Sequence, residues 1–191
     1  MNSKIGIGIA GLGTVGEGFL KQLKKYKTSN KKTSNFELIN IAVKNLRKKR
    51  NVATKNLPLI KDTLSLASNP KIDIVIELIG GSSGVAYKLV KKSLMNGKSI
   101  ITANKALLAI HGNELIKIAE KNNCFISFEA AIAGGIPVVK AIRENLKFNE
   151  ITKVYGILNG TCNYILTKME TEGKDFNSVL KDAQNLGFAE L

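Results

Sequence analysis

Residues 5–16 read IGIGIAGLGTVG, an apolar run that leads directly into the spacing Gly-x-Gly-x-x-Gly. The amphipathic segment 15–23 follows at once, so the pattern predicts a strand, a tight turn and a helix. Gly11 would allow the turn, Gly13 would let the backbone approach a pyrophosphate, and Gly16 would let the helix lie close to the strand. The N-terminus of such a helix attracts phosphates through its free N–H groups and its dipole. The stretch predicts a nucleotide site, and an ordinary glycine turn is the alternative.

The size and composition are those of a globular protein with enough apolar sequence for a core. The chain has 191 residues, of which 44% are hydrophobic, and this length suits one domain and part of a second. No apolar run approaches the roughly 20 residues that cross a bilayer, so we expect no membrane association. Cys124 and Cys162 lack metal-type spacing, which favours a reduced, cytoplasmic protein.

The net charge of +14 raises the question of a nucleic-acid partner. Lysine is spread along almost the whole sequence, often beside asparagine and isoleucine, and a drift in genome composition explains this pattern without any basic function. The sequence has neither aromatic residues interleaved with the basic ones nor a recognised reading motif. We therefore expect solvated lysines and no nucleic-acid partner.

Apolar and amphipathic segments alternate along the first two thirds of the sequence. Strands are predicted at 36–43, 72–79, 99–102 and 125–128. Helices are predicted at 85–95 and 106–121, with one short helix in the connector 57–68. Short connections between these elements favour right-handed crossovers, and hence an α/β fold with a mostly parallel, doubly wound sheet.

Ligands in such sheets bind beyond the carboxyl ends of the strands. Four segments would meet at that edge, namely 11–16, 80–81, 102–105 and 129–135. The backbone at Gly80 could pass close to a cofactor, and Thr102 ends the next strand. Glu77 interrupts an apolar strand and would be buried, so its carboxyl group needs a hydrogen-bonding partner.

The end of the second strand bears on the choice between NADP and NAD. An acidic residue at this place grips the ribose 2′-hydroxyl, but residues 44–50 read KNLRKKR. Cations there suit a 2′-phosphate, since arginine pairs with phosphate through two N–H groups and lysine acts as a point charge. We predict NADP as the cofactor, with NAD as the alternative, and Lys44 and Arg47 as its ligands. An ordinary basic loop is the other interpretation of this segment.

Three further residues are candidates for chemistry. Lys105 lies just past a strand end, where its ammonium group could donate a hydrogen bond to a carbonyl oxygen or stabilise developing negative charge. A solvated charge is the alternative. His111 lies within or near a helix without partners, which indicates a surface or packing role. We interpret Cys162 as a small buried residue at a helix start, because no histidine nearby in sequence would activate its thiol.

From about residue 131 the pattern changes. A helix is predicted from Pro137 to about residue 146, because proline suits a first helical turn. A strand is predicted at 151–158, followed by helices at 163–172 and from Asp175 to residue 186. Asp175 is the predicted N-cap of the last helix.

Four longer stretches resemble homoserine dehydrogenases. They read IVIELIGG (74–81), TANKALLA (102–109), FEAAIAGGIP (128–137) and GILNGTCNYIL (156–166). The resemblance extends over essentially the whole sequence in the same order and spacing. It implies a Rossmann-type NAD(P)-binding domain at 1–130 and the beginning of an α+β catalytic and dimerisation domain at 131–191.

The resemblance also implies an activity. Homoserine dehydrogenases interconvert L-aspartate 4-semialdehyde and L-homoserine with NAD(P) in threonine and methionine biosynthesis. The cofactor carries the hydride, while the protein orients and polarises the small-molecule substrate. A homodimer built through the region after residue 131 is implied for the full-length protein.

Site residues follow from the resemblance by position. The pyrophosphate would be bound by Gly11, Leu12, Gly13, Thr14, Val15 and Gly16, and Lys105 would lie beside nicotinamide and substrate. A monovalent cation such as sodium would be held by Glu129 and by the carbonyl groups of Ile132, Gly134 and Ile136. The substrate would be contacted by Gly160, Thr161 and Glu190.

Two departures from the family pattern concern the substrate. Phe188 stands where the family often has tyrosine, so one hydroxyl group is missing from the substrate pocket. The sequence also stops at Leu191, before the family's substrate-binding aspartate and catalytic lysine. We therefore expect an N-terminal part of the enzyme that is inactive alone, and the alternative is a non-catalytic NADP-binding remnant of the family.

Overall fold

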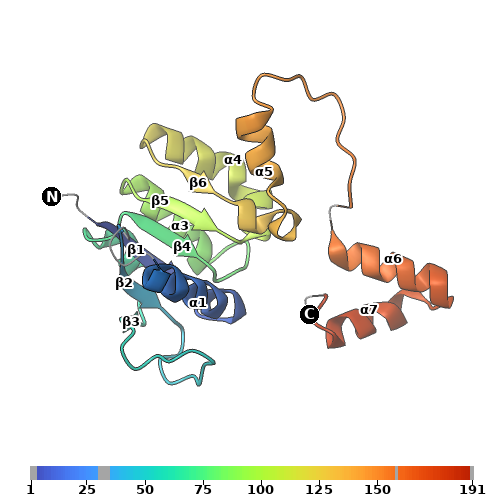
Figure 1. Ribbon diagram of the computed structural model, residues 1–191, viewed down its shortest axis with the longest axis horizontal. Coiled ribbons are helices and arrows are strands. Elements are labelled where there is room, and N and C mark those ends of the chain that lie inside the picture. The colour runs from blue at the N-terminus through green and yellow to red at the C-terminus, as the bar shows by residue number, and fades with distance from the viewer. Residues whose placement is uncertain (1–3, 30–34, 158, 190–191) are drawn as a thin grey trace. The chain divides into compact units, whose positions relative to one another are not determined.

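Residues 4–29, 35–157 and 159–189 are described in the computed structural model. The chain divides into two units, the first ending at Val139 and the second starting at Lys140. In Figure 1 the first unit runs from blue through yellow, and the second contains the red helices.

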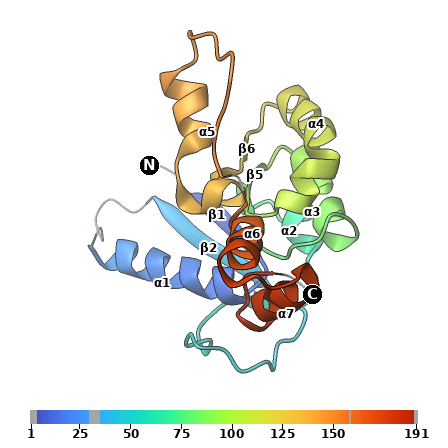
Figure 2. The same cartoon turned by 90° about the vertical axis from the view of Figure 1, so that its right-hand side faces the viewer.

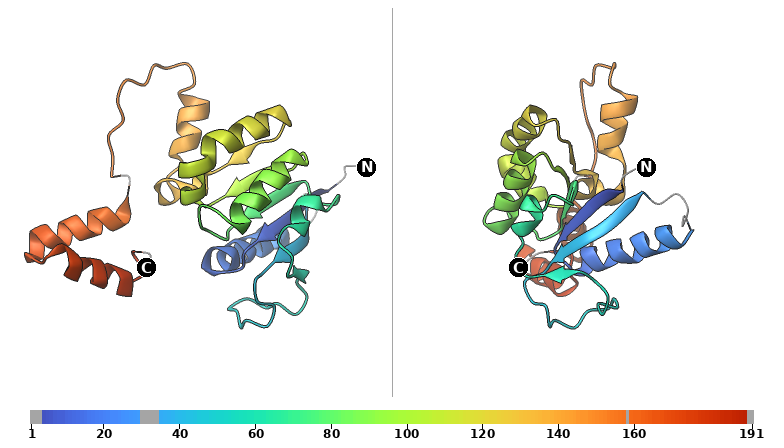
Figure 3. Two further views of the ribbon diagram at one scale, coloured as in Figure 1. Left: turned by 180° about the vertical axis from the view of Figure 1, so that it is seen from behind. Right: turned by 90° about the vertical axis from the view of Figure 1, so that its left-hand side faces the viewer.

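A six-stranded parallel sheet forms the centre of the first unit (Figures 1 and 3). Its strands are β1 (Ile5–Ala10), β2 (Phe36–Ala42), β3 (Leu59–Ile60), β4 (Ile74–Glu77), β5 (Ser99–Thr102) and β6 (Ile126–Ser127). They lie in the order β3-β2-β1-β4-β5-β6, and every neighbouring pair is parallel. The chain thus builds one half of the sheet outward from β1 and crosses back to build the other half from β4. The predicted doubly wound parallel sheet is confirmed.

Helices cover both faces of this sheet. They are α1 (Thr14–Ser29), α2 (Ser65–Ser68), α3 (Val85–Met95) and α4 (Lys105–Lys121). Figures 2 and 3 show α1 on one face and α3 and α4 on the other. Val75 of β4 belongs to the same buried cluster as Leu89 of α3. Ile76 of the same strand belongs to the cluster of Leu20 in α1. Burial on both faces explains why the strand reads as a nearly unbroken β-branched run.

The two-residue strand β3 lies inside segment 57–68, which the sequence predicts as a connector with one short helix. The helix is present as α2. The strand has no signal of its own, because two residues are too few for an alternating pattern. It exists because Leu59 and Ile60 pair with the end of β2.

After β6 the chain forms two 3-10 turns, η1 (Glu129–Ala131) and η2 (Ala133–Gly135). The helix predicted at 137–146 is present as a short helix, α5 (Val138–Lys140), and a π-helical turn, η3 (Ala141–Asn145). No helix among the described residues is long and apolar enough to cross a membrane.

The second unit contains the helices α6 (Gly160–Glu172) and α7 (Phe176–Asn185), which the sequence predicts. Gly173 ends α6 in the left-handed conformation, with φ +63°. The predicted N-cap of α7 is confirmed, because the Asp175 carboxylate accepts a hydrogen bond from the Ser178 N–H at 3.1 Å. The two helices bury Ile165, Val179 and Ala183 between them.

The strand predicted at 151–158 is wrong over the residues that the structure describes. Residues 151–157 form no strand, and Val154, Tyr155 and Ile157 are exposed. A strand needs a neighbour for its backbone N–H and C=O groups. The described part of the second unit contains no strand with which this β-rich segment could pair.

Candidate functional site

The glycine loop follows β1 and leads into α1 at Thr14, as the sequence predicts. Gly11 has φ +100°, and a Cβ atom there would lie 2.5 Å from the carbonyl oxygen of Leu78. A Cβ atom on Gly16 would lie 2.5 Å from the carbonyl oxygen of Gly11, so the helix and the turn can touch only without a side chain. A Cβ atom on Gly13 would meet nothing within 4 Å. The loop is therefore tight on its inner side and open where a phosphate would approach.

A cleft of about 330 Å³ opens beside this loop. It is lined by Leu12, Gly13, Thr14, Glu17, Gly18, Lys21, Lys48, Lys49, Arg50 and Asn51. The basic residues Lys48, Lys49 and Arg50 therefore face the glycine loop across this cleft. Lys44 and Arg47, the predicted 2′-phosphate ligands, are exposed in the same segment but do not line it.

The basic segment after β2 is held by its own hydrogen bonds. Arg50 donates from Nη1 to the carbonyl oxygen of Lys48 at 2.9 Å and from Nη2 to that of Asn45 at 2.7 Å. The backbone N–H of Asn51 donates to Oε2 of Glu17 at 3.2 Å, which attaches the segment to α1. The sequence predicts that this segment binds the cofactor, but it does not predict which of its residues line the cleft. Periodicity carries no information on which side chains of an irregular loop face a helix.

At the next strand ends, Glu77 and Thr102 lie side by side in register. Glu77 is fully buried, and its Oε2 accepts a hydrogen bond from the Thr102 hydroxyl at 2.7 Å. Its Oε1 accepts from the N–H of Ile79 at 2.7 Å and from that of Gly80 at 3.1 Å. The expectation of a buried glutamate with hydrogen-bonding partners is confirmed.

Asn104 connects the same loop to the start of α4. Its Oδ1 accepts a hydrogen bond from the N–H of Leu107 at 3.1 Å, and its Nδ2 donates to the carbonyl oxygen of Gly81 at 2.7 Å. Lys105 follows as the first residue of α4, and it is exposed. A cation in the first turn of a helix is unfavourable for the helix dipole, so Lys105 does not serve to stabilise α4 by its charge.

The four predicted cation-binding residues lie in and beside the turns η1 and η2, directly after β6. Oε1 of Glu129 accepts a hydrogen bond from the N–H of Val139 at 3.1 Å. Gly134 has φ +58°, which interrupts the turn. The described residues contain no group of three or more His, Cys, Asp and Glu side chains that could hold a metal ion. A cation bound with Ile132, Gly134 and Ile136 would therefore depend mainly on carbonyl oxygens, which suit a hard cation.

The sequence matches two family models in series. Residues 11–129 match the model described as "Homoserine dehydrogenase, NAD binding domain", and residues 137–191 match the one described as "Homoserine dehydrogenase". The chain belongs to the homoserine dehydrogenase family. Its glycine loop and most of its sheet thus lie in the segment that the family uses for the nicotinamide cofactor.

Curated relatives extend over nearly all of this chain. The homoserine dehydrogenase of Pseudomonas aeruginosa is 45% identical over 186 residues, which cover 96% of this chain and 42% of that protein. The one of Bacillus subtilis is 42% identical over 188 residues, covering 97% and 43% respectively. The chain therefore spans less than half the length of these relatives.

Solved structures of the family share the fold. A homoserine dehydrogenase from Thiobacillus denitrificans matches with a TM-score of 0.87 at 44% identity, over 98% of this chain and 44% of that one. A hyperthermophilic archaeal homoserine dehydrogenase in complex with NADPH matches with a TM-score of 0.76 at 27% identity, over 98% and 62%.

The substrate residues implied by the family resemblance begin α6 in the second unit. Gly160 and Thr161 occupy its first turn, behind Asn159, whose side chain accepts a hydrogen bond from the Cys162 N–H at 3.0 Å. The Thr161 hydroxyl donates to the carbonyl oxygen of Phe188. Glu190 lies outside the described residues.

Two residues considered for catalysis have other surroundings. The ring of His111 lies against that of Tyr87 in α3, with centroids 4.2 Å apart, and its Nδ1 lies 3.8 Å from Oε2 of Glu114. The predicted packing role is confirmed, but the expected lack of partners is wrong. Cys162 lies at a helix start as predicted, but it is exposed, so the prediction of burial is wrong. The small core of the second unit is built from Ile165 and its partners and leaves the first turn of α6 at the surface.

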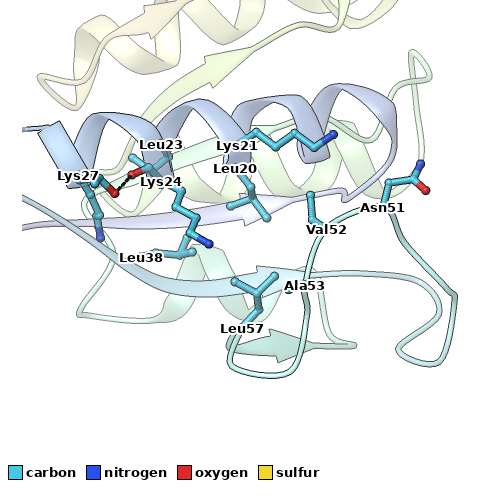
Figure 4. A pocket seen from close by; sticks show the side chains of 11 residues that line it. Leu20, Lys21, Leu23, Lys24, Lys27, Leu38, Asn51, Val52, Ala53 and Leu57 are labelled. Carbon is cyan, nitrogen blue, oxygen red and sulfur yellow. Dashed lines mark hydrogen bonds between the residues drawn. The ribbon is translucent and has the colours of Figure 1, made fainter.

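A larger hollow, of about 540 Å³, lies along the C-terminal half of α1. Figure 4 shows Leu20 and Leu23 of the helix above Leu38 of β2 and Leu57, with Lys24 and Lys27 beside them. The two hollows share Lys21 and Asn51. Of these two hollows, only the smaller one borders the glycine loop.

Proposed function

We propose that this chain supplies the cofactor-binding half of a homoserine dehydrogenase. The whole protein would interconvert L-aspartate 4-semialdehyde and L-homoserine with a nicotinamide cofactor. The proposal rests on the carboxyl edge of the sheet. At this edge the glycine loop follows β1, the turn at Gly80 follows β4, and Lys105 lies shortly after β5. The boundary between the cofactor-binding domain and the catalytic domain would lie near residue 131.

The glycine loop fits a pyrophosphate. Gly13 faces open space, so no side chain stands between the backbone and a ligand. The first turn of α1 starts at Thr14, and its N–H groups and dipole favour an anion. In this proposal the residues Gly11, Leu12, Gly13, Thr14, Val15 and Gly16 hold the phosphates. The bound cofactor supplies the hydride acceptor or donor, and the protein supplies orientation and charge.

Lys105 would act on the substrate. At the start of α4, beside the ends of β4 and β5, its ammonium group would donate a hydrogen bond to the aldehyde oxygen and stabilise the negative charge that develops there. Gly80 and Thr102 would border the nicotinamide. The hydroxyl of Thr102 donates to buried Glu77, so Thr102 would contribute its backbone and its packing.

We propose NADP in preference to NAD. An acidic partner for a ribose 2′-hydroxyl is missing after β2, where the segment carries Lys44 and Arg47. The lysines that line the cleft, Lys48 and Lys49, strengthen this proposal, because they face the glycine loop. Lys48 and Lys49 would contact a 2′-phosphate in the cleft, and Lys44 and Arg47 would add positive charge from the same segment.

A cation, the substrate contacts and the assembly complete the proposal. A sodium ion would bind at Glu129 with the carbonyl groups of Ile132, Gly134 and Ile136, and Gly160, Thr161 and Glu190 would contact homoserine. The whole protein would form a homodimer through the region after residue 131, without a nucleic-acid partner. The exposed apolar side chains of Val154, Tyr155 and Ile157 support a dimer interface in this region, because such an interface would bury them. A cytoplasmic location stays a prediction from the two cysteines.

The test measures NADPH binding and homoserine-dependent NADP reduction with the 191-residue chain and with a chain extended to the length of the relatives. We expect binding by both and turnover only by the extended chain. An extended chain that binds NADPH but never oxidises homoserine would favour the alternative, a non-catalytic NADP-binding remnant. A chain that binds no NADPH refutes both.

A further inference from the structure

We propose that Glu77 is a positioning residue for the nicotinamide end of the cofactor site. It would hold the turn after β4 and the start of α4 in their binding geometry before any ligand arrives. This inference rests on the proposed function, because it concerns the same cofactor.

Glu77 occupies a central place at the carboxyl edge of the sheet. It is the last residue of β4, in register with Ala10 of β1 on one side and Thr102 of β5 on the other. Its side chain is fully buried, and the two carboxylate oxygens accept three hydrogen bonds from three different residues. These bonds fill three of the roughly four acceptor positions of a carboxylate, and the side chain is buried, so Glu77 acts through the groups that it holds.

Those groups form a closed ring of hydrogen bonds. The Thr102 hydroxyl donates to Glu77 and accepts from the backbone N–H of Asn104 at 3.0 Å. The side-chain amide of Asn104 donates to the carbonyl oxygen of Gly81. The backbone N–H of the neighbouring Gly80 donates to Glu77, which completes the ring. The turn after β4 is thereby fastened at both of its ends to the end of β5.

The ring controls the start of α4 in the proposed cofactor site. Asn104 is also the N-cap of α4, so the ring sets where this helix begins and where Lys105 is held. The same turn is also joined to the glycine loop, by contacts that do not involve the Glu77 side chain. The N–H of Leu78 donates to the carbonyl oxygen of Ala10 at 2.8 Å, and Gly11 leaves no room for a Cβ atom beside Leu78.

Only a carboxylate satisfies this arrangement completely. A glutamine at position 77 has one acceptor oxygen and one NH₂ group. If its oxygen accepts from the Ile79 and Gly80 N–H groups, its NH₂ group faces the Thr102 hydroxyl, which must then turn its own hydrogen away. A buried donor that loses its partner carries a desolvation penalty. Glu77→Gln therefore keeps the size of the side chain and loosens the ring.

The experiment compares two ligands on the full 191-residue chain. NADPH contacts both ends of the site, whereas adenosine 2′,5′-bisphosphate carries the adenosine and the 2′-phosphate without the nicotinamide. A positioning role predicts that Glu77→Gln weakens NADPH binding by about tenfold and leaves the affinity for the bisphosphate unchanged. A merely structural role would weaken both ligands alike.

A matched control lies at the opposite edge of the same strands. Lys98 is 7% exposed and donates from Nζ to the carbonyl oxygens of Asn69 and Ile72, before β4 begins. Lys98→Met also breaks buried hydrogen bonds, but far from the strand ends that form the site. We expect it to lower thermal stability without changing the affinity for either ligand.

Thr102→Val provides a second variant if Glu77→Gln fails to fold. It is close to isosteric and removes the hydroxyl that links Glu77 to Asn104, and it should show the same selective loss of NADPH affinity. An unchanged NADPH affinity in the folded variants, or an equal loss for both ligands, overturns the inference while the proposed function stands. If the parent chain binds neither ligand, the proposed function fails first and this inference with it.

Discussion

The backbone N–H of Asn51 donates a hydrogen bond to Oε2 of Glu17 at 3.2 Å. Asn51 directly follows the basic segment 44–50, and Glu17 lies in the first turn of α1, so this bond joins the two walls of the cleft at the glycine loop. The acidic group is thereby kept on the helix side, and the lysines of the other wall face the place where a 2′-phosphate would bind.

This arrangement predicts which cations select the cofactor. Replacing Lys48 and Lys49 together by alanine should weaken NADPH binding by about tenfold and leave NADH binding nearly unchanged, because only NADPH carries the extra phosphate. Fluorescence titration with both cofactors measures this. Lys55→Ala is the control, since Lys55 is an exposed lysine outside the lining of this cleft.

The same titration tests the ligands predicted from sequence. The pair Lys44→Ala and Arg47→Ala should also weaken NADPH more than NADH, but less than the cleft-lining pair, because both side chains lie outside the cleft lining. Equal affinities of the parent chain for NADPH and NADH would contradict the NADP preference altogether.

Gly11→Ala should destabilise the first unit and abolish cofactor binding. The new Cβ atom would meet the Leu78 carbonyl at 2.5 Å in a backbone with φ +100°, which costs on the order of 3 kcal/mol. Gly18→Ala is the counterpart, because a Cβ atom there meets nothing within 4 Å in the interior of α1. It should raise the free energy of unfolding by about 0.5–1 kcal/mol. Urea denaturation of both variants measures these changes, and a Gly11→Ala variant as stable as the parent would count against the tight turn.

Lys98→Met should lower the free energy of unfolding by about 2 kcal/mol, because the carbonyl groups of Asn69 and Ile72 lose buried hydrogen-bond donors. Burial lowers the pKa of Lys98 below the ordinary lysine value, and nearby Asp73 opposes this shift. As pH rises from the lowered pKa toward the ordinary one, the unfolded chain holds more protons than the folded chain, so the parent gains stability. The stability advantage of the parent over Lys98→Met should therefore grow over this alkaline range. A constant difference would show that burial does not affect this titration.

Glu172 should make the second unit sensitive to acid. Hydrogen bonds from Lys168 and Lys174 lower the pKa of its carboxyl group to about 2. A lowered pKa means that its contribution to stability is complete above the ordinary glutamate pKa and is lost as pH falls toward about 2. An NMR titration of the side-chain carboxyl carbon measures the pKa, and Glu172→Gln should remove this component of the acid response of α6 and α7. A midpoint at the ordinary glutamate value would contradict the paired geometry.

The sequence predicts much of the fold because the signals that it carries are local. The apolar run at 5–10, the glycine spacing at 11–16 and the β-branched run at 72–79 each describe one element and its immediate end. Alternation of such elements with short connections then allows few topologies, and the parallel doubly wound sheet is one of them. Asp175 was predictable for the same reason, since a cap bonds to the helix that it begins.

Tertiary structure alone decided the features that depend on partners distant in the sequence. The burial of Glu77 follows from its place in an apolar strand, but its bond to Thr102 exists because β5 lies beside β4. The same holds for Lys48 and Lys49, which line the cleft because Arg50 binds the carbonyl groups of their own segment and Asn51 attaches it to Glu17 of α1. Residues 151–157 have the composition of a strand and are not one. A strand requires a hydrogen-bonded neighbour, and no local pattern supplies that neighbour.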